Sequence, residues 1–371
     1  DAGEPIACAN LGRMFELGVG GVSDIVRAGE LYAGACTAGD AGGCVSLCLL
    51  VEEGRGVERS LTRAVELFDG ACDRSDDIGC INLGRMLEDG RGIARDDVRA
   101  GRLYEAACAG GELLGCTHLG LLAEGGRGVT ADLERARSLH DRACEGDELL
   151  GCANLGVLYE EGRGVEEDAA RARRLYDQAC DGGEPYGCTR LGLLVRASDA
   201  HRAFELFTRG CEAGDLRGCN ALGWSYEHGS GTDVNGTLAA DLYRQACESG
   251  LTAGCTSLGG LYATGIGVVA DPVEAARLYQ EACTAGHMLA CNNLGGLYET
   301  ALGVRRDTRR AIDLYDQACE GGEMRGCFNT ARLYETGAIG GTPSTSQAQR
   351  YYDRACSGGY RTACEHVITS E

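Results

Sequence analysis

The chain has 371 residues, and its 35 basic side chains against 56 acidic ones give a formal charge of −21. This acidic balance argues against a protein that binds nucleic-acid phosphates. None of the basic residues is lysine, which excludes Walker-type phosphate loops, Schiff-base lysines and the Ser-x-x-Lys nucleophile pair. No apolar run reaches the roughly 18 residues of a membrane span, so we expect a soluble chain without one.

Cysteines recur with a regular spacing along the chain. Of the 22 cysteines, 20 fall into ten pairs whose members are eight residues apart. The second cysteines of successive pairs are 36 residues apart from Cys44 to Cys188, then 31 to Cys219, again 36 to Cys327, and 37 to Cys364. Such a period identifies a tandem repeat.

Each repeat contains two segments with helical periodicity. The first follows the second cysteine and reads Cys-x-Asn-Leu-Gly-x-Leu-Tyr-Glu, as at 152–160. A turn, Gly-Arg-Gly-Val-x-x-Asp at 162–168, has glycines that end a helix and an acidic residue that begins one. The second segment, Ala-x-x-Leu-Tyr-x-x-Ala-Cys at 172–180, places apolar residues on one helix face. Each repeat is therefore predicted to be an antiparallel helix hairpin.

A hairpin of this size buries its apolar faces only by stacking on its neighbours. The predicted fold class is therefore all-α, an α/α solenoid of about ten hairpins. We predict a single solenoid domain over 1–371 with repeats of 36 residues, one shortened repeat at 188–219 and an incomplete eleventh unit at 364–371.

These motifs resemble the Sel-one-like repeat (SLR) family, a relative of the tetratricopeptide repeat, and more closely its disulfide-bearing branch, typified by the Helicobacter cysteine-rich proteins. The resemblance covers essentially the whole chain. The departures are Cys48 in place of the first-helix glycine, Ala331 at the same position in the last unit, and the shortened unit around Arg196. The resemblance implies a right-handed superhelix whose hairpins are stapled by disulfides.

The disulfides expected from this resemblance each join one second helix to the next first helix. They pair Cys36 with Cys44, Cys72 with Cys80, Cys108 with Cys116, Cys144 with Cys152, Cys180 with Cys188, Cys211 with Cys219, Cys247 with Cys255, Cys283 with Cys291, Cys319 with Cys327, and Cys356 with Cys364. The alternative is metal binding, but zinc sites favour closer cysteines, and the 6 histidines show no periodicity. Disulfides imply an oxidising compartment, extracellular or periplasmic, with the mitochondrial intermembrane space as the alternative.

Two cysteines remain outside the pairs. Cys8 matches the second cysteine of a pair whose partner falls before Asp1, so the chain is expected to begin inside a staple. Cys48 is expected to be a buried small residue, and a bridge between Cys8 and Cys48 is the alternative.

The sequence contains no recognisable catalytic motif. His-Glu-x-x-His and Gly-x-Ser-x-Gly are both absent, and we expect neither a cofactor nor a metal. The resemblance to the cysteine-rich proteins implies β-lactam binding or hydrolysis, yet the lysine-dependent serine route has no lysine here. A protein that is not an enzyme is the preferred interpretation.

Candidate binding residues come from resemblance to tetratricopeptide packing, which places positions two, five and eight after each second cysteine on the concave face. The candidates are Asn82, His118, Asn154, Arg190, Trp224, Asn293, Glu88, Glu124, Glu160 and Glu227. Their amides and carboxylates suit a peptide backbone or a basic partner. The alternative is that Asn bonds only to the neighbouring backbone and that Glu only solvates a helix.

Three further features stand out. Trp224 is the only tryptophan, and the next two repeats have Gly260 and Gly296 at the same position, which predicts either a pocket with an aromatic wall or simple space filling. The Gly-Arg-Gly arginines predict either a charged edge for contacts between molecules or local ion pairs with glutamate; they are Arg55, Arg91, Arg127 and Arg163. Asn235 begins an Asn-x-Thr sequon and is a candidate glycosylation site.

Two functions fit these observations. The first is a secreted or periplasmic scaffold that binds a protein or peptide on its concave face. The second is a structural protein whose copies stack head to tail into an extracellular fibre, because neither end of the chain has a recognisable capping repeat.

Overall fold

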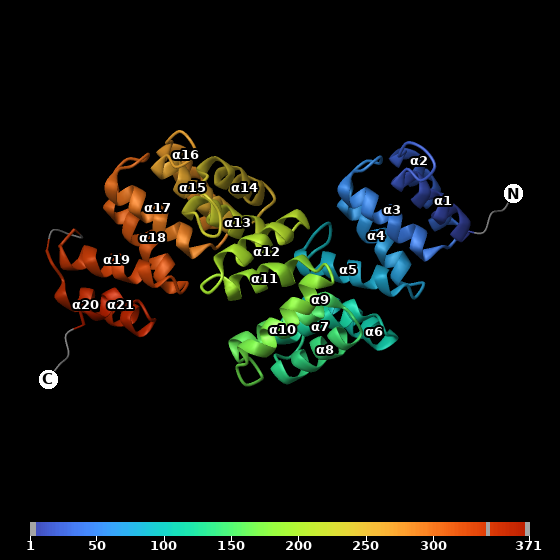
Figure 1. The fold of residues 1–371 in the computed structure, drawn as a ribbon, viewed down its shortest axis with the longest axis horizontal. Helices are drawn as coiled ribbons and strands as arrows, with labels where there is room; N and C mark the ends of the chain where they lie inside the picture. The colour runs from blue at the N-terminus through green and yellow to red at the C-terminus, as the bar shows by residue number, and fades with distance from the viewer. Residues whose placement is uncertain (1–4, 339–341, 368–371) are drawn as a thin grey trace. The chain divides into compact units, whose positions relative to one another are not determined.

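The computed structural model describes residues 5–338 and 342–367. Within these ranges the chain consists of α-helices joined by turns and loops, without a strand. By its contacts the chain divides into two compact units, Asp1–Gly187 and Cys188–Glu371. Each unit is a row of helix hairpins (Figure 1). The single domain over 1–371 stays a prediction, and the predicted eleventh unit at 364–371 lies partly outside the described residues.

The first unit contains ten helices, in which odd-numbered members are first helices and even-numbered members second helices. They are α1 (Pro5–Leu17), α2 (Ile25–Thr37), α3 (Ala41–Glu53), α4 (Leu61–Cys72), α5 (Asp77–Asp89), α6 (Asp97–Gly110), α7 (Leu113–Gly125), α8 (Leu133–Glu145), α9 (Leu149–Glu161) and α10 (Ala169–Asp181).

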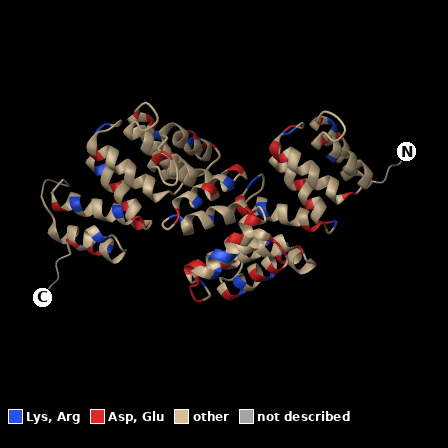
Figure 2. Ribbon diagram, viewed as in Figure 1, with Lys and Arg blue, Asp and Glu red and all other residues tan. Residues whose placement is uncertain are grey.

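The second unit continues the same alternation. Its helices are α11 (Pro185–Val195, which begins at the end of the first unit), α12 (Ala200–Glu212), α13 (Leu216–His228), α14 (Gly236–Glu248), α15 (Thr252–Thr264), α16 (Pro272–Thr284), α17 (Met288–Thr300), α18 (Thr308–Glu320), α19 (Met324–Glu335), α20 (Thr345–Ser357) and the single turn α21 (Arg361–Cys364). Acidic and basic residues are interspersed along the helices of both units (Figure 2).

The Gly-Arg-Gly turn ends the first helix and leads into the second. Gly162 caps α9 in the left-handed region with φ 64°, which glycine adopts without a Cβ clash. Gly164 has φ 68°, and a Cβ there would lie 2.7 Å from the Cβ of Leu133 in the preceding hairpin. Asp168 then caps α10, because its side chain accepts a hydrogen bond from the amide of Arg171.

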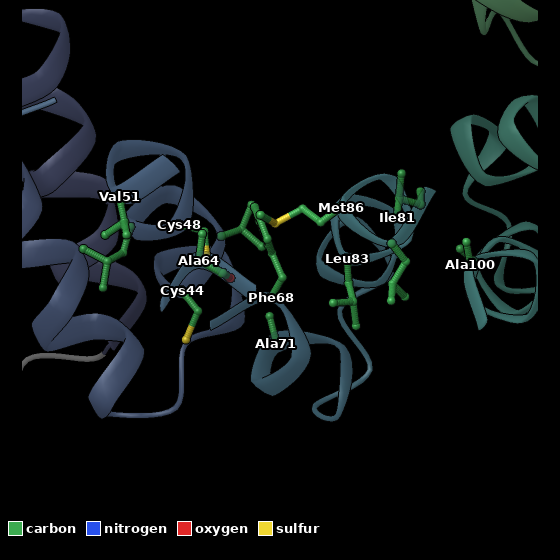
Figure 3. Close-up of a cluster of buried hydrophobic side chains, with 14 of the residues drawn as sticks. Cys44, Cys48, Val51, Ala64, Phe68, Ala71, Ile81, Leu83, Met86 and Ala100 are labelled. Atoms are coloured by element: carbon green, nitrogen blue, oxygen red, sulfur yellow. The ribbon is translucent and has the colours of Figure 1, made fainter. Parts of the chain in front are cut away.

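The Gly of Asn-Leu-Gly is required because a tyrosine ring lies against it. A Cβ on Gly156 would lie 2.6 Å from Cε1 of Tyr176, a ring that is completely buried. The two departures from this pattern are also buried: Cys48 lies in one apolar cluster with Phe68, and Ala331 in another with Tyr352. Figure 3 shows Cys48 beside Ala64, with Phe68 nearby in the same cluster.

Consecutive hairpins are joined by disulfides. Nine bonds link cysteines eight residues apart, from Cys36–Cys44 to Cys356–Cys364, with Cα–Cα distances of 4.4 to 4.8 Å. Cys180 and Cys188 are disulfide-bonded as well. Cys8 and Cys48 are free thiols, so the alternative bridge between them does not form.

Candidate functional site

The glutamates eight residues after the second cysteine bind a buried tyrosine of their own repeat. The tyrosine hydroxyl donates to the carboxylate over 2.7 Å from Tyr104 to Glu88, 2.8 Å from Tyr243 to Glu227 and 2.6 Å from Tyr176 to Glu160. In the fourth hairpin His140 replaces the tyrosine, and its Nε2 lies 2.9 Å from Glu124. A buried hydroxyl needs an acceptor, so these carboxylates have a structural role.

An arginine from the next Gly-Arg-Gly turn binds the same carboxylates in the first unit. Arg127 lies 3.0 Å from Glu88, and Arg163 lies 3.1 Å from Glu124. Arg55 also pairs with Glu53, and Arg163 with Glu161, in each case two residues away. The local ion pairs that the sequence suggested as an alternative are therefore present, in addition to the ion pairs with the preceding repeat. These arginines are 37 to 50% exposed, so each pair stabilises by at most about 1 kcal/mol.

Burial raises the pKa of three tyrosines of this kind, and the neighbouring carboxylates raise it further. Tyr104, Tyr243 and Tyr315 are all shifted upward by desolvation together with Glu88, Glu227 and Glu299 respectively. Tyr279 has a different partner, because its own repeat has Ala263 where most repeats have glutamate. Burial still raises the pKa of Tyr279 to about 12, and its hydroxyl is hydrogen-bonded to Asn293.

The candidates two residues after the cysteine have different environments in the first unit. Asn82 is half-buried and bonds to the backbone oxygen of Ile78 and to Arg85, as in the local alternative. His118 stacks on Tyr104 at 4.9 Å, and burial together with Arg85 lowers its pKa to about 4. Asn154 is only 7% exposed, and its Nδ2 has no hydrogen-bond acceptor within the described residues.

The second unit places Trp224 in a stack. The guanidinium of Arg196 lies over the indole at 4.7 Å, and the His228 ring is parallel to it at 4.5 Å. His228 Nδ1 also lies 3.0 Å from the Trp224 carbonyl oxygen, which holds the imidazole in place. Arg190 lies half-buried on α11, two residues after its cysteine.

Gly260 and Gly296 leave the same row open beside Trp224. A Cβ on Gly260 would meet only the hydroxyl of Tyr279, at 3.6 Å, and a Cβ on Gly296 only that of Tyr315, also at 3.6 Å. A side chain at either glycine would therefore have room, with a tyrosine hydroxyl as its nearest neighbour. Tyr279 and Ala263 were missed from the sequence, although the break in the glutamate row is visible there.

Other chemistry is sparse. No group of three or more His, Cys, Asp or Glu suited to a metal ion occurs in the described part of the chain. None of the described helices is long and apolar enough to cross a membrane. Asn235 is exposed and caps α14, because its side-chain oxygen accepts a hydrogen bond from the amide of Leu238 at 3.1 Å.

Comparison with known proteins places these features in context. The sequence profile of the Sel1 repeat matches ten segments, namely 5–40, 42–76, 78–112, 114–148, 149–184, 187–215, 216–251, 252–287, 289–323 and 325–360. A search of curated proteins found no match.

Among solved structures, a protective antigen with an SLR fold from uropathogenic Escherichia coli is 24% identical, with a TM-score of 0.55 over 99% of this chain and 81% of that one. A Sel1 repeat protein from Oxalobacter formigenes is 23% identical, with a TM-score of 0.49 over 86% of this chain and 91% of that one. Helicobacter pylori cysteine rich protein B is 26% identical, with a TM-score of 0.29, and covers 36% of this chain and 95% of its own. The predicted all-α solenoid of helix hairpins is confirmed.

Proposed function

The chain belongs to the Sel1 repeat family, and from that premise we propose that it is a non-catalytic scaffold that binds a peptide or protein along its first helices. The face concerned is built from positions two, five and eight after each second cysteine, and we name it the first-helix face. We further propose that the protein works outside the cytoplasm, in the extracellular space or the periplasm. The support for this location is the disulfide in each cysteine pair, since such bonds persist in an oxidising compartment.

The observation that carries the proposal is the open strip beside Trp224 in the second unit. The Trp224 ring is in contact with the Arg196 guanidinium and with the His228 ring, so it is pre-organised. Such rigid aromatic anchors dominate the energetics of protein interfaces. An apolar side chain of the partner lies over Gly260 and Gly296, against the indole.

Polar groups around the strip suit the partner's backbone. Among the described residues the Tyr279 hydroxyl has no glutamate acceptor and is hydrogen-bonded to Asn293, whereas Tyr243 and Tyr315 each donate to a carboxylate. Separately from the strip, the Nδ2 of Asn154 in the first unit has no hydrogen-bond acceptor among the described residues. A peptide carbonyl satisfies such a donor. The net charge of −21 favours a basic partner through electrostatic steering.

The test uses the only tryptophan as its own probe. Peptides are selected from a random phage library against the oxidised chain, and their binding is measured by Trp224 fluorescence and by anisotropy of a labelled peptide. We expect Gly260→Leu, which fills the strip, to weaken the selected peptides by about tenfold or more. Gly34→Leu is the matched control, because Gly34 is exposed and has no neighbour within 4 Å of its Cβ position.

The decisive comparison is between these variants and Trp224→Ala. Peptide binding to Trp224→Ala is measured by anisotropy alone, because this variant lacks the tryptophan. Equal affinity of wild type, Gly260→Leu and Trp224→Ala would remove this strip from the binding face. Light scattering on the same samples distinguishes a monomeric scaffold from the alternative end-to-end fibre.

A further inference from the structure

A cavity of about 500 Å³ lies on the second unit between α18 and the end of α19. Its lining consists of Thr308, Arg309, Ile312, Asp313, Asp316, Tyr334 and Ala338. Asp316 is half-buried, and Tyr334 stacks on Tyr351 of α20 with ring centroids 5.8 Å apart. The cavity thus combines two carboxylates, an aromatic ring and apolar walls.

Two carboxylates at the equivalent position in the first unit are each bound by an arginine of the next repeat. The carboxylate three residues before the first cysteine is Asp69 in one repeat and Glu105 in the following one. Arg99 binds Asp69 at 2.5 Å, and Arg135 binds Glu105 at 2.6 Å. Both arginines occupy the same repeat position, nine residues before the first cysteine of the next pair.

A third arginine at that position binds an aromatic ring instead. Arg171 also lies nine residues before its cysteine, and its guanidinium lies 4.2 Å from the centroid of Tyr159. Tyr159 is seven residues after its second cysteine, which is the repeat position of Tyr334. The chain therefore uses this arginine position in two ways, for an ion pair and for a cation–π contact.

At the cavity both acceptors are present but the arginine is missing. Asp316 stands at the position of Asp69, and Tyr334 at that of Tyr159, whereas the arginine position is occupied by Gln347. Asp316 accepts a hydrogen bond from Thr330 at 2.9 Å and another from Tyr351, and it forms no ion pair within the described residues. Burial raises the pKa of its carboxyl, the direction expected where no cation compensates desolvation. Arg309 also lines the cavity but is exposed, and no ion pair joins it to Asp313 or Asp316.

We propose that this cavity is a binding site for a guanidinium group supplied from outside the chain, which takes the place that Arg99, Arg135 and Arg171 occupy in other repeats. The cation lies between the Asp316 carboxylate and the ring of Tyr334, and the aliphatic stem of an arginine packs on Ile312. Its source is an arginine side chain of a partner polypeptide or a free small guanidine. The site is separate from the strip beside Trp224, so it stands whether or not that strip binds a peptide.

The experiment titrates the oxidised chain, labelled at isoleucine methyl groups, with arginine amide and with citrulline amide as the uncharged control. We expect a saturable shift of the Ile312 methyl signal with arginine amide and none with citrulline amide. Asp316→Asn is expected to weaken binding by about tenfold or more, since a charge-assisted contact is lost. Asp69→Asn, at the equivalent position that already has its arginine, leaves the affinity unchanged.

The second variant, Gln347→Arg, restores the missing arginine of the chain itself. It is expected to abolish binding of arginine amide and to raise the melting temperature. Because this variant keeps Asp316 and Tyr334 intact, loss of binding cannot be attributed to a damaged fold. Tighter binding of acetyl-Gly-Arg-Gly-amide than of ethylguanidinium assigns the site to a partner chain, and equal binding assigns it to a free guanidine. An unshifted Ile312 signal, or undiminished binding by Gln347→Arg, would overturn the proposal.

Discussion

Adding a single methyl group at Gly84 tests the packing of a first helix on its second helix. The Cβ of an alanine at position 84 would lie 2.5 Å from Cε1 and 2.8 Å from Cζ of Tyr104. That ring is completely buried, is tied to Glu88 by a 2.7 Å hydrogen bond, and is stacked on His118. Because the ring is restrained in three ways, the helices must separate to admit the methyl group.

Overpacking of this kind costs about 1 to 3 kcal/mol, and the better helix propensity of alanine returns up to about 1 kcal/mol. We therefore expect Gly84→Ala to lower the free energy of unfolding by roughly 1 to 2 kcal/mol. Gly70→Ala is the matched control, since its Cβ would have only the Arg74 guanidinium nearby, at 3.8 Å. That control is expected to be neutral or stabilising by up to about 1 kcal/mol.

The assay is urea unfolding with the disulfides intact, followed by circular dichroism at the helical signal. Long repeat arrays deviate from two-state unfolding. We therefore compare the urea concentration at the midpoint of the first transition, for variants whose unfolding free energy has the same dependence on urea concentration. The reasoning is refuted if both variants shift the midpoint in the same direction by similar amounts.

Three other perturbations have defined outcomes. Replacing Cys283 and Cys291 together by serine opens an eight-residue staple and should cost about 2 to 3 kcal/mol in calorimetry, whereas an unchanged melting temperature would contradict the entropic argument. Raising the pH above about 9 should begin to lower stability through the buried Cys48 thiol, because burial raises its folded pKa above the unfolded one. Above about pH 10 each buried tyrosine should add a loss of up to about 1.4 kcal/mol per unit for the same reason. For Tyr279 this loss extends to about pH 12, and tyrosinate absorbance that rises before the helix signal falls would disprove it. A thiol reagent should modify Cys8 in the native protein and reach Cys48 only in denaturant, because Cys48 is buried and burial raises its pKa; rapid native labelling of both would show that the core around Phe68 opens.

The repeat, its hairpins and the cysteine pairing were all predictable from the sequence, for a common physical reason. Each depends on residues close together in the chain: helical periodicity within 13-residue segments such as α9, a glycine turn such as 162–168, and cysteines eight residues apart. Local geometry decides such features, and ten imperfect copies of the same pattern make it unmistakable. Membership of the Sel1 repeat family followed from the same motifs.

Only the tertiary structure showed which side chains from different helices contact one another. The glutamates looked free to bind a ligand, but Glu88 lies between Tyr104, 16 residues later in the same hairpin, and Arg127 of the next turn. The pairing depends on how hairpins rotate against each other, which no local pattern encodes. The same holds for Asp316, whose missing arginine became visible only when Arg99 and Arg135 were seen to bind the equivalent carboxylates.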